Sequence, residues 1–370
     1  MKIVQITTVH HAFDIRIFRK ECITLARACH NVILIAPHEK NEIVDGVRIV
    51  ALSKPKNRLS RIFGLTWRAL SLARAEHADV YHFHDPELLL IGLLLKVFTK
   101  GKVIYDVHED HPQEILTKDW IPTFLRFPIF VIFSKIEMFA ARFFDQVVVV
   151  TERIAENFAQ FNPIIIHNYP DLKILPIPSE RIRKDKEKTF VFIGGISKLR
   201  GALEMVLAFE CLDPALDGRL DLMGRFEPKN LEAVLQDLPG YDHVRFLGWL
   251  AWAEAWKKAQ DAIAGLVLYH PVPNHIESQP NKIFEYMAAG LPVIASNFPL
   301  WKEIIEGSHC GLTVDPLKPK QIADAIEYLI MHPDEGRKMG ENGNQAVREK
   351  YNWGREGEKL VRLYEETSRR

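Results

Sequence analysis

Cysteine is scarce in this chain, and its few positions exclude two kinds of small scaffold. The four cysteines are scattered and none belongs to a Cys-x-x-Cys pair: Cys22, Cys29, Cys211 and Cys310. Disulfide frameworks and structural zinc modules need cysteines at paired spacings. The cysteine content is instead typical of a protein that folds in a reducing compartment.

Net charge and long apolar runs are also missing. The chain has 48 basic and 48 acidic side chains, so bulk electrostatics give no reason to expect a nucleic-acid partner. The longest apolar runs, such as Phe127-Pro-Ile-Phe-Val-Ile-Phe133, are too short to span a bilayer. A strand begins directly at Met1-Lys-Ile-Val-Gln-Ile-Thr7, which leaves no room for a signal peptide. The sequence therefore predicts a cytoplasmic protein.

The chain does contain enough apolar sequence for two domains. Its 370 residues are 47% hydrophobic and 26% charged, the balance of a soluble globular protein. In the first part, β-rich runs alternate with helical stretches such as Ile17–Ala28 and Leu59–Arg74. The runs are Lys2–Thr7, Asn31–Ala36, Val47–Ala51, Val80–His84, Val103–Val107 and Gln146–Thr151. This alternation predicts a parallel sheet with right-handed crossovers.

A polar, proline-bearing stretch at 171–188 interrupts this pattern and predicts a linker. The pattern then restarts with the runs Phe190–Ile193, Leu220–Met223, Val244–Phe246, Gly265–Tyr269 and Pro292–Ala295. We therefore expect an α/β protein with a first domain over 1–170 and a second over 189–354. Two Rossmann-like, doubly wound domains of this kind would face each other across a cleft at the carboxyl ends of their strands.

Two glutamates stand eight positions apart in the most informative segment, Glu277-Ser-Gln-Pro-Asn-Lys-Ile-Phe-Glu285-Tyr-Met-Ala-Ala-Gly290. The segment predicts a loop, then a helix from about Lys282 to Ala289, with Gly290 as its stop. Free amides at the helix start and the Lys282 side chain would make an anion site, for which phosphate is the obvious ligand. One turn further in, the Glu285 carboxylate could accept hydrogen bonds from sugar hydroxyls. The segment therefore predicts a site for a phosphorylated sugar.

This segment resembles the signature of glycosyltransferase family 4, and two other stretches do so as well. These are Asp14-Ile-Arg16-Ile-Phe-Arg-Lys-Glu21 near the start and Phe190-Val-Phe-Ile-Gly194-Gly195-Ile-Ser-Lys-Leu-Arg200-Gly201. The resemblance implies the GT-B architecture and a retaining enzyme that uses a nucleotide-diphosphate sugar and no metal cofactor. It also implies that a last helix, about 355–370, packs back on the first domain.

The resemblance assigns the donor site to the second domain. It implies catalytic roles for Glu277 at the sugar, and for Arg200 and Lys282 at the diphosphate, while Glu285 binds the ribose. The remaining donor-binding positions it implies are Gly194, Gly195, Gly248, Leu250, Asn281 and Ile283. Two departures stand out: Gly195 replaces an arginine that is usual in the family, and Ser278–Asn281 replaces a Gly-Phe-Gly loop. The plainer interpretations are surface cations for Arg200 and Lys282, an exposed helix position for Glu285 and an ordinary cap for Glu277.

His108 follows a strand of the first domain and matches the family's catalytic histidine beside the donor sugar. The alternative is a histidine that only satisfies buried backbone groups at a strand end. His84, Asp85 and Glu109 also follow strands and are candidates for lining the acceptor site. His82 and His84 share a strand face with no third metal ligand at a suitable spacing, so we expect no metal there.

The first loop, His10-His-Ala-Phe-Asp14-Ile-Arg16, lacks the Gly-Gly pair that many family members carry. Asp14 and Arg16 are therefore candidates for the acceptor side of the site. An internal salt bridge between them that caps the next helix is an equal alternative.

The acceptor is predicted to be a glycan or a lipid-linked acceptor of the kind used in surface-polysaccharide assembly. Residues 46–75 contain no acid but carry Arg48, Lys54, Lys56, Arg58, Arg61, Arg68 and Arg74. Within them, Leu59, Ile62, Phe63, Trp67 and Leu70 share one helical face. These residues fit either a helix on the anionic inner face of the plasma membrane or a crossover helix buried on its sheet, and we favour burial for the apolar side chains. The aromatic stretch Phe124–Phe133, in what reads as a connecting region, is a second candidate for membrane contact.

Two other functions remain open at this stage. One is a nucleotide-sugar 2-epimerase of similar architecture, which converts its donor without any acceptor. The other is a silent nucleotide-sugar binder, suggested by the arginine missing at Gly195.

Overall fold

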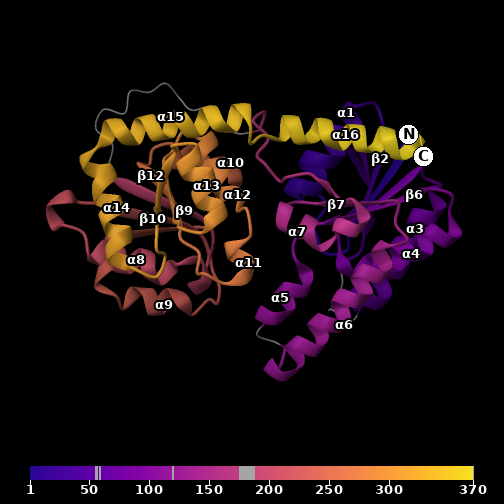
Figure 1. Ribbon diagram of the computed structural model, residues 1–370, viewed down its shortest axis with the longest axis horizontal. Coiled ribbons are helices and arrows are strands. Elements are labelled where there is room, and N and C mark those ends of the chain that lie inside the picture. Colours follow the sequence, from indigo (N-terminus) through magenta and orange to yellow (C-terminus); the bar gives the residue numbers. More distant parts are fainter. Residues whose placement is uncertain (55–56, 58–59, 119–120, 175–187, 370) are drawn as a thin grey trace. The chain divides into compact units, whose positions relative to one another are not determined.

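The computed structural model describes residues 1–54, 57, 60–118, 121–174 and 188–369. The chain divides into two compact units (Figure 1). Unit 1 comprises Met1–Asn168 with Trp353–Arg370, and unit 2 comprises Tyr169–Asn352. Most of the predicted linker, 175–187, lies outside the described residues.

Unit 1 is built on an eight-stranded sheet with the order β3-β4-β2-β1-β5-β6-β7-β8. All neighbouring strands are parallel except the β3–β4 hairpin. The strands are β1 (Lys2–Ile6), β2 (Asn31–Pro37), β3 (Glu42–Val44), β4 (Val47–Leu52), β5 (Val80–Phe83), β6 (Lys102–Val107), β7 (Gln146–Val149) and β8 (Ile164–Ile165).

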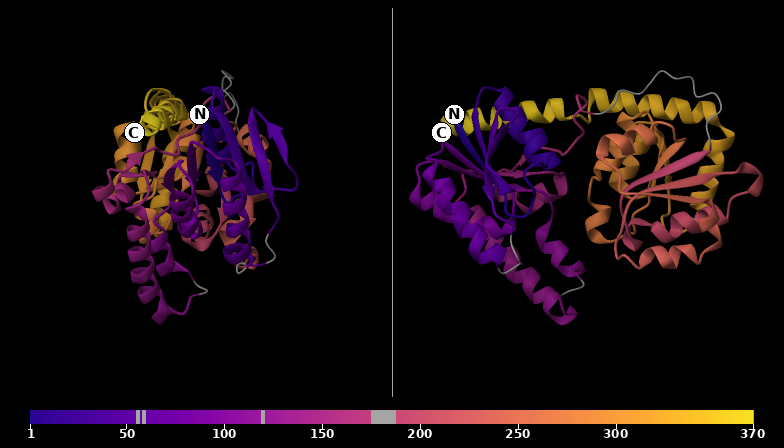
Figure 2. Two further views of the ribbon diagram at one scale, coloured as in Figure 1. Left: turned by 90° about the vertical axis from the view of Figure 1, so that its right-hand side faces the viewer. Right: turned by 180° about the vertical axis from the view of Figure 1, so that it is seen from behind.

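Helices cover both faces of this sheet (Figures 1 and 2). One layer holds the π-helix η1 (Ile15–Cys22), α1 (Ile23–Arg27) and the C-terminal helix α16 (Trp353–Arg369). It packs on one set of alternating strand residues, including Ile3 and Val80. The other layer packs on the opposite set, including Val4 and Tyr81. It is formed by η2 (Arg61–Leu65), α3 (Thr66–Ala75), α4 (Leu89–Phe98) and α6 (Thr123–Ala141).

Shorter helices close the loops of unit 1 and add no further layer. They are η3 (Pro86–Leu88), α5 (His111–Thr117), α7 (Glu152–Asn157) and η4 (Ala159–Phe161).

Unit 2 has a six-stranded parallel sheet with the order β11-β10-β9-β12-β13-β14. Its strands are β9 (Thr189–Ile196), β10 (Arg219–Phe226), β11 (Val244–Gly248), β12 (Ala264–Val267), β13 (Val293–Ser296) and β14 (Gly311–Val314). In chain order this is the arrangement 3-2-1-4-5-6 of a Rossmann sheet, whose order reverses between β9 and β12.

The helices of unit 2 share a single hydrophobic core with its sheet. The α-helices are α8 (Ala202–Glu210), α9 (Leu231–Gln236), α10 (Trp252–Ala259), α11 (Pro273–Ile276), α12 (Asn281–Ala288), α13 (Pro299–Gly307), α14 (Pro319–Met331) and α15 (Pro333–Glu349). Short 3₁₀ turns are η5 (Lys198–Arg200), η6 (Pro214–Leu216) and η7 (Pro239–His243).

The predicted fold class is confirmed, with two parallel-sheet α/β units. All eleven predicted strands exist, and each end lies within three residues of its predicted position. The helix after Glu277 begins at Asn281, and Gly290 follows it with a φ of 69°, as expected of a helix stop. Three short strands that lacked a strong apolar pattern, β3, β8 and β14, were not predicted.

Two expectations about the helices of unit 1 were wrong. Residues Phe124–Phe133 lie inside α6 and do not form a connecting region, since the helix runs through Pro128. On the basic crossover helix Leu70 is buried as expected, but Ile62 and Trp67 are exposed. Leu59 and Arg58 and the side chain of Phe63 lie outside the described part of the chain. Within that part, no helix is both long and apolar enough to cross a membrane.

Candidate active site

In unit 2, the glycines Gly194 and Gly195 lie near the carboxyl end of β9, next to the point where the strand order reverses. Parallel α/β sheets bind ligands at such a switch point, because the loops on either side diverge and leave a crevice. The topology therefore places this glycine pair where a ligand would lie against unit 2.

Gly194 and Lys282 approach each other closely. A β-carbon at position 194 would lie 2.8 Å from Nζ of Lys282, and the φ of Gly194 is +130°. The lysine Nζ donates a hydrogen bond of 3.1 Å to the hydroxyl of Tyr269. Glycine at 194 therefore gives the lysine side chain the space in which it lies.

Arg200 occupies the corresponding space beside Gly195. Its Nη1 donates to the Gly195 carbonyl at 3.2 Å and would lie 2.6 Å from a β-carbon at that position. The guanidinium carbon is 5.8 Å from the centre of the Tyr269 ring, and Lys282 Nζ is at the same distance from that ring. Two cations thus flank one aromatic ring at the end of β9.

The turn that carries Arg200 requires glycine at its end. Gly201 has a φ of +72°, and a β-carbon there would lie 2.0 Å from the carbonyl oxygen of Leu268. Only glycine tolerates that approach. It allows the turn η5 to pack closely against the end of β12, and this packing sets the position of Arg200.

The segment with the two glutamates follows α11. Glu277 is exposed at the end of α11, and Glu285 is partly buried in α12. Asn281 is the first residue of α12, while the Ile283 side chain is fully buried and leaves only its backbone for a ligand. Both cations and this helix start lie in unit 2, but Gly248 ends the far edge strand β11 and Leu250 follows it.

In unit 1, the candidate residues surround the buried carboxylate of Asp106. Arg16 donates to both oxygens of Asp106, at 3.0 and 3.2 Å, and its Nε lies 3.0 Å from Glu21. Nε2 of His108 lies 3.0 Å from Oδ2 of Asp106 and 3.1 Å from Nδ1 of His84. One anion therefore links η1 to the ends of β5 and β6.

The charges in this cluster follow from burial and from Arg16. The guanidinium and His108 hold the pKa of Asp106 well below its usual range, although burial opposes this. Burial and the neighbouring Asp106 raise the pKa of Glu21 well above its usual value. Burial lowers the pKa of His84 well below its usual value and also lowers the pKa of His82. At neutral pH Asp106 is therefore charged and His82 and His84 are neutral, while the environment of Glu21 favours its protonated form.

The first loop is held by two carboxylates. Asp14 caps η1 by accepting from the amides of Arg16 and Ile17, at 2.8 and 2.9 Å. Asp85 is buried and accepts from the amide of Thr8 at 2.5 Å and from the hydroxyl of Thr7 at 2.9 Å. Asp14 therefore acts as the expected cap, whereas Arg16 pairs with Asp106 and Glu21 and not with Asp14.

Exposure separates the acceptor candidates into two groups. Arg16, His84 and Asp85 are each at most 4% exposed, so they support the residues around them and cannot contact a ligand directly. Glu109 is exposed and His108 is partly exposed, so these two can reach a ligand directly.

Family models match both units. The model described as "Glycosyltransferase Family 4" matches residues 16–173, and "Glycosyl transferases group 1" matches residues 187–332. This chain belongs to glycosyltransferase family 4.

The curated relatives of this chain include two mannosyltransferases. A phosphatidyl-myo-inositol mannosyltransferase of Mycobacterium leprae is 28% identical over 48% of this chain and 46% of the relative. A GDP-mannose-dependent α-(1-6)-phosphatidylinositol monomannoside mannosyltransferase of Mycobacterium tuberculosis is 26% identical over 49% and 48%. The match thus spans about half the length of these relatives.

Solved structures show the same fold over the whole chain. The sucrose-phosphate synthase of Thermosynechococcus elongatus has a TM-score of 0.79 at 18% identity and covers 99% of this chain and 98% of its own. The Anabaena protein HepE in complex with UDP-glucose has a TM-score of 0.72 at 14% identity, with coverage of 99% and 100%. At these identities the likeness establishes the GT-B fold.

The arginine that the family resemblance implies is absent at Gly195. The space that a side chain at 195 would fill holds the guanidinium of Arg200, with Glu227 Oε2 only 3.3 Å from the same point. A cation and a carboxylate therefore both lie beside the glycine pair.

Four side chains of the Asp106 cluster have the spacing of a metal site. Glu21, His84, Asp106 and His108 each offer an atom within 4.8 Å of the others. Arg16 already places a positive charge against two of these carboxyl groups, which gives the cluster the character of an ion-pair network.

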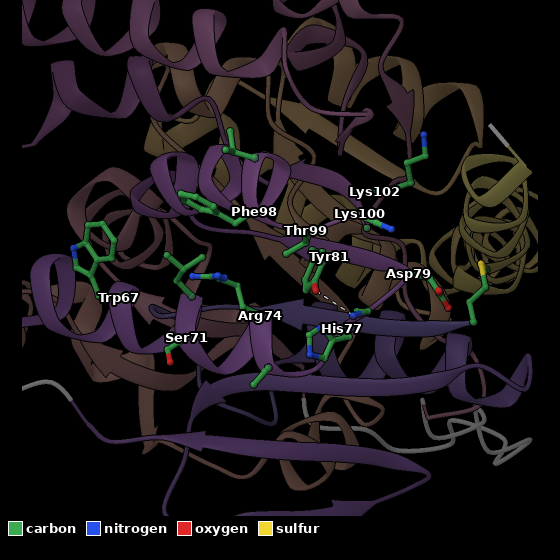
Figure 3. A pocket seen from close by; sticks show the side chains of 16 residues that line it. Trp67, Ser71, Arg74, His77, Asp79, Tyr81, Phe98, Thr99, Lys100 and Lys102 are labelled. Atoms are coloured by element: carbon green, nitrogen blue, oxygen red, sulfur yellow. Dashed lines mark hydrogen bonds between the residues drawn. The ribbon is translucent and has the colours of Figure 1, made fainter.

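Two cavities of unit 1 differ in their relation to these residues. One, of about 1290 Å³, lies near the amino ends of β5 and β6, where Trp67, Arg74, Phe98 and Lys100 line it (Figure 3). It contains none of the candidate residues, which follow the carboxyl ends. A smaller cavity of about 220 Å³ is lined by Glu109 and by the buried Glu137 of α6.

Several residues of the unit 1 site were not predicted from the sequence. Asp106 stands two positions before His108 on one strand face, a spacing that could have indicated it. Tyr364 of α16 hydrogen-bonds to His82, but the two are 282 positions apart and no local pattern connects them. Tyr269 contacts both cations of unit 2. In the sequence it only ends an apolar strand run, and nothing there indicates a role in a site.

Proposed function

We propose that this protein is a retaining glycosyltransferase that moves a sugar from a nucleoside-diphosphate sugar to a lipid-linked acceptor. The observation that carries the proposal is the pair of cations beside Gly194 and Gly195 at the switch point of unit 2. Lys282 and Arg200 converge there from α12 and η5 and occupy the side-chain space of the two glycines. Such a site suits a diphosphate.

The cations account for the main electrostatic demand of the reaction. As the glycosidic bond to the donor breaks, negative charge grows on the departing diphosphate while the sugar becomes oxocarbenium-like. Lys282 and Arg200 would stabilise that charge, and their preorganisation against Tyr269 lowers the cost of doing so. Glu285 would bind the ribose and Glu277 the transferred sugar. No protein nucleophile is assigned in this scheme.

His108 is the proposed contact from unit 1 to the reacting sugar or to the acceptor hydroxyl. It is the partly exposed end of the otherwise buried Asp106 cluster. Glu109 follows it and lines the cavity of about 220 Å³ between the loop after β6 and α6. That cavity is the proposed place for the sugar of the acceptor.

A lipid-linked acceptor is supported by the outer surface of the α3, α4 and α6 layer. Six large apolar side chains of α6 and the residues after it form one exposed helical stripe: Leu125, Ile129, Ile132, Ile136, Phe139 and Phe143. Lys135 and Arg142 border this stripe, and the one acid of α6, Glu137, is buried. α3 and α4 contain no acid and add the exposed Trp67, Leu90, Val97 and Phe98.

An apolar ridge with basic borders and no exposed acid has the chemistry of a peripheral membrane surface. Burial of a large aliphatic or aromatic side chain contributes about 1.5–3 kcal/mol, and each basic residue adds about 1 kcal/mol near an anionic leaflet. We therefore propose that unit 1 rests on the anionic inner face of the plasma membrane through this layer.

The experiment is an assay with purified protein, a panel of UDP-, GDP- and dTDP-sugars, and lipid acceptors in vesicles. Transfer of a labelled sugar into the lipid fraction is the expected result. Conversion of a donor in the absence of acceptor would instead identify an epimerase. Donor binding with no turnover on any acceptor would identify a silent binder.

A further inference from the structure

The side chains around His108 form one chain of hydrogen bonds that ends on the C-terminal helix. Nδ1 of His84 meets Nε2 of His108 at 3.1 Å, and Nε2 of His84 meets Oε1 of Gln5 at 2.5 Å. Nε2 of Gln5 reaches the Tyr364 hydroxyl at 3.1 Å and Nδ1 of His82 at 3.3 Å. The Tyr364 hydroxyl lies 2.6 Å from the same His82 nitrogen.

The proton positions in this chain follow from the charge of Asp106. An ionised carboxylate only accepts hydrogen bonds, so the His108 nitrogen facing it, Nε2, must carry a proton. His84 is neutral and accepts at Nδ1, which leaves its proton on Nε2 for the Gln5 carbonyl oxygen. The Gln5 amide group then donates toward Tyr364 and His82.

The last step of the chain returns to Asp106. Because His82 accepts at Nδ1 from the Tyr364 hydroxyl, its own proton lies on Nε2, 3.6 Å from Oδ2 of Asp106. This assignment of protons gives each successive hydrogen bond from His108 through His84, Gln5 and Tyr364 to His82 one donor and one acceptor. If the Gln5 amide were turned over, its NH₂ group would face the protonated Nε2 of His84. Two donors would then meet, so this orientation is excluded.

The consequence for His108 is a fixed tautomer. With Nε2 protonated against Asp106, a neutral His108 has its lone pair on Nδ1. Among the described residues none hydrogen-bonds to that atom, and the side chain is 14% exposed. A hydroxyl group of a sugar is the ligand class that suits an exposed imidazole acceptor.

We propose that Asp106 and Tyr364 are positioning residues that hold His108 as the Nε2-protonated tautomer, so that Nδ1 accepts a hydrogen bond from a substrate hydroxyl. Asp106 sets the tautomer directly. Tyr364 sets it through the Gln5 amide, whose orientation the tyrosine hydroxyl fixes. The role of this tautomer in turnover rests on the proposed function, but the tautomer itself does not.

The groups that face His108 come from several elements. Asp106 and His84 contact its Nε2 edge, and His10 from the first loop lies with its ring centre 5.9 Å away. Asp14 and His111 are close enough for their pKa values to respond to its charge. A pH profile alone would mix these groups, so the tautomer must be measured directly.

The test is long-range ¹H–¹⁵N NMR of protein labelled at the histidine ring nitrogens, with the His108 signals identified by their loss in His108→Gln. The wild-type protein should show His108 protonated at Nε2. In Asp106→Asn, Arg16 should retain the amide oxygen and turn the amide NH₂ toward His108, which moves the proton to Nδ1. Melting curves confirm that each variant is folded, and Asp106→Glu, which keeps the charge, should keep the tautomer.

Activity supplies the second readout. Asp106→Asn should lower kcat about tenfold or more with a smaller change in the donor KM, because one hydrogen bond to the substrate is lost. Tyr364→Phe should give a mixture of His108 tautomers and a several-fold lower kcat. Tyr81→Phe, which removes another buried hydroxyl of unit 1 on the opposite sheet face, is the matched control and should match the wild-type protein.

The outcomes separate the two proposals. A His108 protonated at Nδ1 in the wild-type protein, or one whose tautomer is unchanged in Asp106→Asn, would overturn the role of Asp106. A Tyr364→Phe variant identical to wild type in tautomer and kcat would overturn the role of Tyr364. A protein with the expected tautomers that binds no nucleotide sugar would leave the positioning intact and overturn the proposed function.

Discussion

Nζ of Lys282 lies 2.8 Å from the point where a β-carbon at Gly194 would stand. The lysine of α12 and the glycine of β9 are 88 positions apart in the sequence and are in contact in the fold. The lysine side chain occupies the space that a side chain at position 194 would need. Glycine at 194 therefore allows a positive charge to lie against the backbone of β9.

Gly194→Ala tests that relationship. The added methyl group collides with Lys282 and strains a φ of +130°, so we expect donor affinity to fall at least tenfold and unfolding free energy to fall by about 1 kcal/mol or more. Isothermal titration with the donor and urea denaturation give the two values. Gly307→Ala, at the exposed end of α13 where nothing lies within 4 Å, should bind donor normally.

Lys282→Met should raise the donor Kd and lower kcat, because a methionine of similar length keeps the packing against Tyr269 but loses the charge. Loss of a charge-assisted hydrogen bond to a phosphate corresponds to about 1.5–3 kcal/mol, or roughly ten- to a hundredfold in affinity. Lys302→Met on the surface of α13 is the control. Equal donor binding by Lys282→Met and wild type would remove the lysine from the site.

Glu137 gives the protein a pH-dependent stability. Burial raises the pKa of this carboxyl from 4.5 to about 7, so the folded state holds a proton that the unfolded chain releases between these values. Its contribution is therefore most favourable below pH 4.5 and is lost as the pH rises to about 7. The loss is about 3 kcal/mol, from about 1.4 kcal/mol per pKa unit.

Glu137→Gln should reveal that loss, since glutamine can still accept from the Tyr105 hydroxyl without a charge. Relative to wild type, the variant should gain stability between pH 4.5 and 7 and show no further gain above that range. Urea denaturation across the pH range measures the difference, with Glu254→Gln on the surface of unit 2 as control. A difference that is flat with pH would contradict the buried-carboxyl account.

The fold and the helix that carries Lys282 and Glu285 in the candidate site could be predicted from the sequence because their signals are local. Strand runs, Gly290 and the Lys282–Glu285 helix follow from periodicity and spacing within about ten residues. The aromatic stretch Phe124–Phe133 was misread as a connecting region, whereas it lies inside α6, which continues through Pro128. The Gln5–Tyr364 contact could not be predicted, because only the packing of α16 on unit 1 brings those residues together.

The apolar stripe of α6 predicts reversible membrane binding. Ile136→Glu with Phe139→Glu should reduce binding to vesicles containing phosphatidylglycerol at least tenfold, because two large side chains are lost from the interface. Vesicle co-sedimentation at low and high salt measures this. Ile43→Glu with Ile174→Glu, exposed on β3 and in unit 2, should bind as wild type does.

Two results would oppose the membrane surface. Binding that survives the double substitution in α6 would place the contact elsewhere. A wild-type protein that ignores vesicles but forms dimers, with dimers abolished by the same substitutions, would show that a second copy covers the stripe.

The most direct test of the central claim is calorimetric titration of the purified protein with UDP-, GDP- and dTDP-sugars, repeated on Lys282→Met. We predict saturable binding of at least one nucleotide sugar to the wild-type protein, with affinity reduced at least tenfold in the variant. No binding of any nucleotide sugar to the wild-type protein would contradict the account.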